Sequence, residues 1–84
     1  MTAYNGHPSW NAWNVSLWIG NDEGLYRAAV EALNSTHTLR HATNVFFGLT
    51  GTRYERTPDG AVYSAKSVNH ALAGLEIQQP KREY

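Results

Sequence analysis

Apolar residues recur at helical spacing in four stretches of the 84-residue chain, and short polar segments separate these stretches. Spacings of three and four residues place side chains on one face of a helix. The separating segments contain asparagine, glycine or proline, which favour turns. The pattern predicts helices at about residues 10–19, 23–33, 39–50 and 65–75.

The first stretch, SWNAWNVSLWI at residues 9–19, fits two kinds of secondary structure. As a strand, it alternates apolar and polar side chains from residue 13 onwards. As a helix, it has two apolar faces, one with Trp10, Trp13, Leu17 and Trp18 and the other with Val15 and Ile19. A serine before the first tryptophan is a typical N-cap and favours the helix. We expect Trp10 and Trp13 to lie in the core and Trp18 to be a candidate for the surface.

Capping residues divide the rest of the chain into helices. Asp22 can cap the second helix, with Glu23 beside its positive end. The third helix can open at Thr36 or Thr38 and end at Gly51. A serine, Ser64, precedes the fourth helix in the same way.

A turn interrupts the segment TRYERTPDGAVYS, residues 52–64. Pro58 suits the second position of a type I turn, and Gly60 suits the left-handed position that follows it. The flanking residues 53–56 and 61–63 are therefore predicted to pair as a β-hairpin. The expected fold is one small α+β domain of three to four helices and one β-hairpin. It spans residues 1–84, with an N-terminal arm at 1–8 and a polar tail at 77–84.

Composition narrows the class of protein. The chain has no cysteine, which excludes disulfides and thiolate metal sites and fits a reducing, cytoplasmic environment. No apolar run approaches the roughly 18 residues of a membrane span, and no secretory signal opens the chain. Seven basic residues balance seven acidic ones, so neither a nucleic-acid binder nor a nucleic-acid mimic is indicated overall. We expect a soluble protein without membrane contact.

Catalytic and metal-binding patterns are weak. His37 and His41 are four residues apart, and on one helix they would share a face that can hold a divalent metal. Such a site needs further ligands, which His7, His70 or an acidic residue could supply only through folding. No nucleophile motif or phosphate-binding loop occurs. The expectation is a protein with no enzymatic activity, no metal and no cofactor, and a metal-dependent enzyme built on His37 and His41 is a distant alternative.

Aromatic residues are numerous for a domain of this size, with three tryptophans, five tyrosines and two phenylalanines. A small domain can bury only some of them, so we expect Trp18 or Tyr54 to face a partner. Tyr54 stands near Arg53 and Arg56, an arrangement that could stack a base and contact phosphate. Direct binding of nucleic acid is nevertheless not favoured, because the net charge is zero.

Several motifs resemble those of small proteins encoded by phages and other bacterial mobile elements. They are Tyr4-Asn5-Gly6, the segment SWNAWNVSLWIGNDE at residues 9–23, the later TPDGAVY at residues 57–63, and Val68-x-x-Ala71-Leu72. The resemblance covers residues 4–33 well and the remainder loosely. In size and style the chain is also similar to anti-CRISPR proteins that inhibit type I systems. This implies a stoichiometric inhibitor in the bacterial cytoplasm that blocks target DNA binding or nuclease recruitment.

The resemblance supplies no catalytic residues, so the partner contacts are chosen by chemistry alone. Acidic and aromatic side chains near the second helix, and a basic and aromatic group on the hairpin, suit a protein interface. The predicted contacts are Trp18, Asp22, Glu23, Tyr26, Arg53, Tyr54 and Arg56. The expected partner is a Cas subunit of a type I interference complex. The alternative is a nucleic-acid-binding accessory protein of a mobile element, and a homodimer is compatible with each hypothesis.

Overall fold

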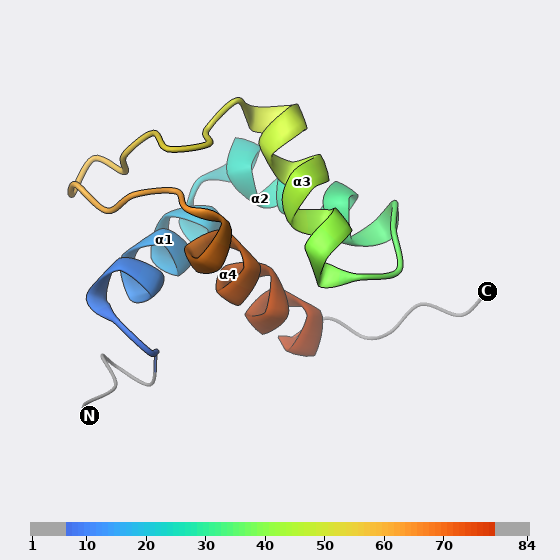
Figure 1. Ribbon diagram of the computed structural model, residues 1–84, viewed down its shortest axis with the longest axis horizontal. Helices are drawn as coiled ribbons and strands as arrows, with labels where there is room; N and C mark the ends of the chain where they lie inside the picture. The colour runs from blue at the N-terminus through green and yellow to red at the C-terminus, as the bar shows by residue number, and fades with distance from the viewer. Residues whose placement is uncertain (1–6, 79–84) are drawn as a thin grey trace.

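Four α-helices build the fold (Figure 1). The structure is a computed structural model, and it describes residues 7–78. The helices are α1 (Trp10–Asn21), α2 (Glu23–Asn34), α3 (Leu39–Thr50) and α4 (Ala65–Gln78). α1 packs chiefly on α4, α2 packs on α3, and α4 also contacts α3. A loop at residues 51–64 connects α3 to α4 and arches past α1 (Figure 1).

The predicted α+β class is wrong, because the described part of the chain is all-α and contains no β-strand. The predicted hairpin is reduced to one antiparallel bridge between Arg56 and Val62. Two local features limit the sheet. The backbone N–H and C=O of Val62 face away from Arg56 and bond to the side chain of Asn11 on α1, so a helix covers the edge where a further strand would pair. On the other arm, Tyr54 has a φ of 66°, which breaks the extended conformation.

The helix boundaries follow the predicted caps. Each cap side chain accepts a hydrogen bond from a backbone N–H that has no partner inside its helix. The bonds run from Ala12 N to Ser9 Oγ, from Leu25 N to Asp22 Oδ1, from His41 N to Thr38 Oγ1 and from Ser67 N to Ser64 Oγ, at 3.0–3.1 Å. Gly51 ends α3 with a φ of 68°, as expected of a left-handed C-cap. The first stretch is therefore a helix, as predicted, and not a strand.

The core face of α1 is the opposite of the one predicted. Val15 and Ile19 are fully buried, whereas Trp10 is 39% exposed. The expectation that Trp10 holds the core is therefore wrong. Trp13 and Trp18 are each half-buried. The face of α1 that meets α4 carries small side chains, among them Ala12, Ser16 and Gly20. Small residues allow two helices to approach closely, and bulky indole rings would hold them apart.

The hydrophobic core draws on all four helices and on the loop. Phe46 of α3 is its largest fully buried side chain, and Ala61 and Tyr63 extend the core into the loop. Most of the predicted arm at 1–8 and of the predicted tail at 77–84 lies outside the described residues. Within residues 7–78, no helix is long and apolar enough to cross a membrane.

Candidate functional site

Polar side chains attach the loop at residues 51–64 to α1. Asn14 is 1% exposed, and its amide bonds to two loop residues at once. Its Oδ1 accepts from Thr57 Oγ1 at 2.6 Å, and its Nδ2 donates to Asp59 Oδ2 at 2.9 Å. Trp18 Nε1 donates to the same Asp59 oxygen at 3.0 Å. Because Asn14 and Thr57 are both buried, the bond between them forms in a setting where an unpaired polar group is costly.

A second amide on α1 continues this attachment. Asn11 Nδ2 donates to the carbonyl of Val62 at 2.9 Å, and Asn11 Oδ1 accepts from the Val62 N–H at 2.7 Å. Asn11, Asn14 and Trp18 are spaced by three and four residues, so they lie along one stripe of the helix. We call these three residues and their loop partners Thr57, Asp59 and Val62 the α1–loop lock.

The turn at the tip of the loop has the predicted geometry. Gly60 N donates to the carbonyl of Thr57 at 2.8 Å, and Thr57 N donates to the carbonyl of Ala61 at 2.7 Å. Gly60 has a φ of 99°, a conformation that only glycine adopts without strain. Arg56 Nη1 donates to the carbonyl of Gly60 at 2.9 Å, which fixes one predicted contact residue against the turn.

The lock lowers the pKa of Asp59. The hydrogen bond from Asn14 has the largest effect, and the bond from Trp18 adds to it, because both donors favour the charged carboxylate. A carboxyl group whose pKa is lowered by folding stabilises the fold above its ordinary pKa of 3.8, and this contribution is lost as the pH falls through the lower, folded value.

Replacing Asp59 with asparagine is therefore expected to make stability less sensitive to acid. The new amide keeps an oxygen that can accept from Asn14 and Trp18 but cannot titrate. Urea unfolding of both proteins between pH 2.5 and pH 6 measures the effect. The unfolding free energies of wild type and Asp59→Asn should converge below pH 4. Parallel curves across that range would show that Asp59 contributes nothing through its charge.

Among the large hydrophobic residues of the described structure, Tyr54 is the most exposed, at 72%. Its φ of 66° is a left-handed conformation in which a bulky side chain is strained. The backbone around it is fixed by bonds from Tyr54 N to the carbonyl of Tyr63 at 3.0 Å and from Glu55 N to the carbonyl of Thr52 at 2.8 Å. The loop thus holds the phenol ring outward on a defined backbone.

Arg53 anchors the base of this turn. Its guanidinium lies 4.4 Å from the centroid of the Phe47 ring, and its Nη2 donates to Asn44 Oδ1 at 3.2 Å. A cation over an aromatic face is attracted by the ring quadrupole. Arg53 therefore connects the loop to α3, just as the lock connects it to α1.

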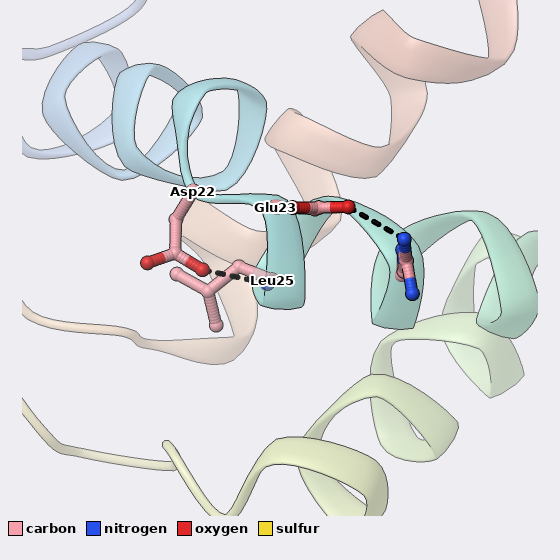
Figure 2. Close-up of polar contacts among 4 residues, drawn as sticks. Asp22, Glu23 and Leu25 are labelled. Atoms are coloured by element: carbon pink, nitrogen blue, oxygen red, sulfur yellow. Dashed lines mark hydrogen bonds and ion pairs between the residues drawn. The ribbon is translucent and has the colours of Figure 1, made fainter.

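The predicted acidic contacts have structural roles of their own (Figure 2). Asp22 caps α2 through its bond from Leu25 N, while the Glu23 carboxylate points in a different direction and pairs with Arg27. Burial raises the pKa of Tyr63, and the negative charge of Asp22 raises it further. Tyr26 is half-buried and packs against the core.

Substitutions at Asp22 should separate its capping role from its charge. Asp22→Ala is expected to lower the unfolding free energy by about 1 kcal/mol, because an N-cap is lost. Asp22→Asn keeps an acceptor oxygen, so it should lower the unfolding free energy by only a few tenths of the loss expected for Asp22→Ala. Glu23→Gln, which disrupts only an exposed ion pair, should change stability by less than about 0.5 kcal/mol. Chemical denaturation of the three variants checks this order, and a large loss in Glu23→Gln would contradict it.

The histidines group differently from the prediction. His37 precedes Thr38, the N-cap of α3, so it does not share a helical face with His41. Among residues 7–78, no three or more histidine, cysteine, aspartate or glutamate side chains gather as a metal site. Instead, His7 Nδ1 lies 2.8 Å from His70 Nε2. Burial lowers the pKa of His70, and the charge of His7 lowers it further.

Comparison with known proteins gives one match. The model of DUF7249, described as a family of unknown function, matches residues 1–83. The chain belongs to this family. No curated protein and no solved structure matches it.

In this DUF7249 protein, the predicted contact residues form two groups. Arg53, Tyr54 and Arg56 lie on the loop, whereas Asp22, Glu23 and Tyr26 lie at the start of α2. Trp18 joins the loop through Asp59. The sequence analysis missed Asn11, Asn14 and Asp59. A signal was present, because the two asparagines stand at helical spacing from Trp18.

Proposed function

We propose that this protein is a non-catalytic binding protein that contacts its partner through the loop at residues 51–64, with Tyr54 at the centre of the contact. The proposed partner is a Cas subunit of a type I CRISPR–Cas interference complex in the bacterial cytoplasm. Binding would block target DNA binding or nuclease recruitment by steric occlusion. The observation that carries the binding proposal is the exposed, left-handed Tyr54.

The backbone conformation of Tyr54 supports a role in binding. A left-handed conformation costs a non-glycine residue about 1 kcal/mol or more, and glycine would relieve that strain. The phenol ring does not repay the strain by burial, because 72% of the residue is exposed. Strained residues held by their surroundings are concentrated at binding sites. A tyrosine at this position is therefore best explained by a contact outside the fold.

The chemistry around Tyr54 supports a protein partner. Tyrosine and arginine are enriched among the residues that dominate binding energy in protein interfaces. Arg53 and Arg56 are both exposed, and each is held in place by a bond to its own chain. A contact surface that is rigid before binding loses little entropy on association. The choice of a type I Cas subunit rests on the similarity of the chain in size and style to anti-CRISPR proteins, not on the loop.

Nucleic-acid binding remains the second candidate, because Tyr54 could stack a base between the two arginines. Two observations favour a protein partner over it. Arg53 and Arg56 already donate to Asn44 and Gly60, which leaves fewer N–H groups for phosphate. The chain also has a net charge of zero. Binding through phosphates would weaken steeply with salt for any sequence.

A pull-down from cells that express a type I interference complex tests the proposal. Tagged protein is purified at low and high salt, and retained proteins are identified by mass spectrometry. We expect one Cas subunit to be retained at both salt concentrations. Retention of nucleic acid alone, lost at high salt, would overturn the inhibitor proposal in favour of the accessory-protein alternative. An assay of target DNA binding by the purified interference complex, with and without this protein, then tests the mechanism.

A further inference from the structure

Two histidines far apart in sequence are hydrogen-bonded to each other beside the contact between α1 and α4. His7 lies before α1, and His70 lies on α4, 63 residues later. His7 Nδ1 and His70 Nε2 are 2.8 Å apart, and the ring centroids are 5.0 Å apart. These distances describe a linear bond, in which the hydrogen of one ring points at the lone pair of the other.

The charge of the two rings decides whether this bond can form. Two neutral rings form it, because one facing nitrogen carries a hydrogen and the other accepts it. A pair with one positive charge forms a stronger bond, because the charged ring donates to the neutral one. When both rings are charged, both facing nitrogens carry hydrogen, and at 2.8 Å neither can accept. The doubly charged pair must therefore separate.

We propose that His7 and His70 form a pH-sensitive switch, which ties the start of α1 to α4 at neutral pH and opens in acid when both rings are charged. His7 stands two residues before Ser9, the N-cap of α1. The first turn of α1 also carries Asn11, which bonds to the loop at Val62. Opening of the switch would remove one of the contacts that hold this turn in place.

The surroundings of the histidine pair oppose a second positive charge. Two cavities, of about 150 and 230 Å³, adjoin His70, and neither is lined by an acidic residue or by a side chain of α2 or α3. Lys66, one turn earlier on α4, is the one other charged residue in their linings. The described helix α1 contains no charged residue, and its N-terminal end, beside His7, is the positive end of the helix dipole. No carboxylate in these linings would stabilise the doubly charged pair.

The pKa of His70 shifts in the direction that the switch requires. Burial lowers this pKa, and the charge of His7 lowers it further. A histidine whose pKa is lowered by folding stabilises the fold above its ordinary pKa of 6.5. This contribution is lost as the pH falls from 6.5 through the lower, folded value, so the switch opens on the acid side of the ordinary histidine range.

Nuclear magnetic resonance of the full chain with ¹⁵N-labelled histidine tests the switch. At about pH 7.5 we expect a coupling between His7 Nδ1 and His70 Nε2 across the hydrogen bond, and at about pH 4.5 we expect its loss. Hydrogen exchange of the Trp13 N–H, which donates to the carbonyl of Ser9 at 3.0 Å, reports on the first turn of α1. Its protection factor should fall by about tenfold over this range, as expected for the loss of one charge-assisted hydrogen bond.

Two variants serve as the comparison. His7→Asn removes the switch and leaves the helices intact, because His7 lies outside them. In this variant the protection of Trp13 should be low at both pH values, and the pKa of His70 should rise, because the charge of His7 no longer opposes its protonation. His37→Asn/His41→Asn removes two exposed histidines and should respond to pH as wild type does. Circular dichroism confirms that each variant is folded.

Three results would overturn the proposal. The first is the absence of the coupling between the rings at pH 7.5. The second is an equal fall in the protection of Trp13 in wild type and His7→Asn, because the histidine bond would then not hold α1. The third is loss of the pH response in His37→Asn/His41→Asn, which would place the response on the exposed histidines.

Discussion

Asn14→Ala is expected to lower the free energy of unfolding by about 2–4 kcal/mol. The substitution removes the acceptor of Thr57 Oγ1 and one of the two donors to Asp59, and it leaves a gap between α1 and the loop. Thr57 Oγ1 still accepts from Ala61 N at 3.0 Å, but its buried O–H is left without an acceptor, which costs about 1–3 kcal/mol, and the lost packing adds to this. A domain of this size has a total stability of about 5–10 kcal/mol, so the loss would be a large share of it.

Urea unfolding of Asn14→Ala beside Asn21→Ala measures this effect. Asn21 ends the same helix but is exposed, so its replacement should change stability by no more than about 0.5 kcal/mol. The same residue type is thus removed from one helix at a buried and at an exposed position. Equal stabilities for the two variants would show that the lock does not hold the loop in place.

Tyr54→Gly is expected to weaken partner binding by about 30-fold or more while leaving the fold intact. Loss of an interface residue that dominates binding costs about 2 kcal/mol or more, which corresponds to that factor. The fold responds differently. Glycine relieves the left-handed strain, and this gain offsets or exceeds the greater flexibility that glycine gives the unfolded chain. The unfolding free energy should therefore stay the same or rise slightly.

Affinity for the subunit recovered in the pull-down and unfolding in urea should be measured on the same samples. Leu49→Ala is the matched control, because Leu49 is also an exposed apolar residue but lies on α3 outside the loop. It should bind as wild type does. Undiminished binding by Tyr54→Gly would show that Tyr54 does not contribute to the interface. A loss of more than about 1 kcal/mol of stability would instead give the residue a structural role.

The helices were predictable because their signals are local. A cap residue and the three residues after it form a self-contained unit, so Ser9, Asp22, Thr38 and Ser64 mark the helix starts without knowledge of the rest of the fold. Asp22 also follows the last residue of α1, and its N–H bonds to the carbonyl of Trp18 at 2.9 Å. One residue thereby ends one helix and begins the next.

The core face of α1 and the fate of the hairpin depend on contacts distant in sequence. Both faces of α1 are apolar, and only the close approach of α4 selects the face with Val15 and Ile19. The arms around Pro58 bond to each other from Thr57 N to Ala61 O and from Tyr63 N to Glu55 O, but the left-handed Tyr54 ends the pairing and Asn11 covers the outer edge of Val62. Periodicity within either segment reveals neither feature.

The candidate site was predicted in part. The residue type of Tyr54 suggested a contact residue. In the structure Tyr54 is exposed and has a strained, left-handed backbone. Its partner is a proposal. The motifs at residues 9–23 and 57–63, which carried the resemblance, prove to contact each other through Asn14 and Asp59. Three of the predicted partner contacts, Trp18, Asp22 and Glu23, lie in the first motif. The asparagine, threonine and aspartate side chains that join the two motifs maintain the fold.

The central claim is that these two motifs form one unit, and a double-mutant cycle of Asn14→Ala and Thr57→Val tests it most directly. Both single variants and the double variant are unfolded in urea. If the buried bond between the two side chains joins the motifs, the double variant should be more stable than the sum of the single losses implies, by about 1–2 kcal/mol. Additivity within about 0.5 kcal/mol would contradict the claim, because it would mean that α1 and the loop are stabilised independently.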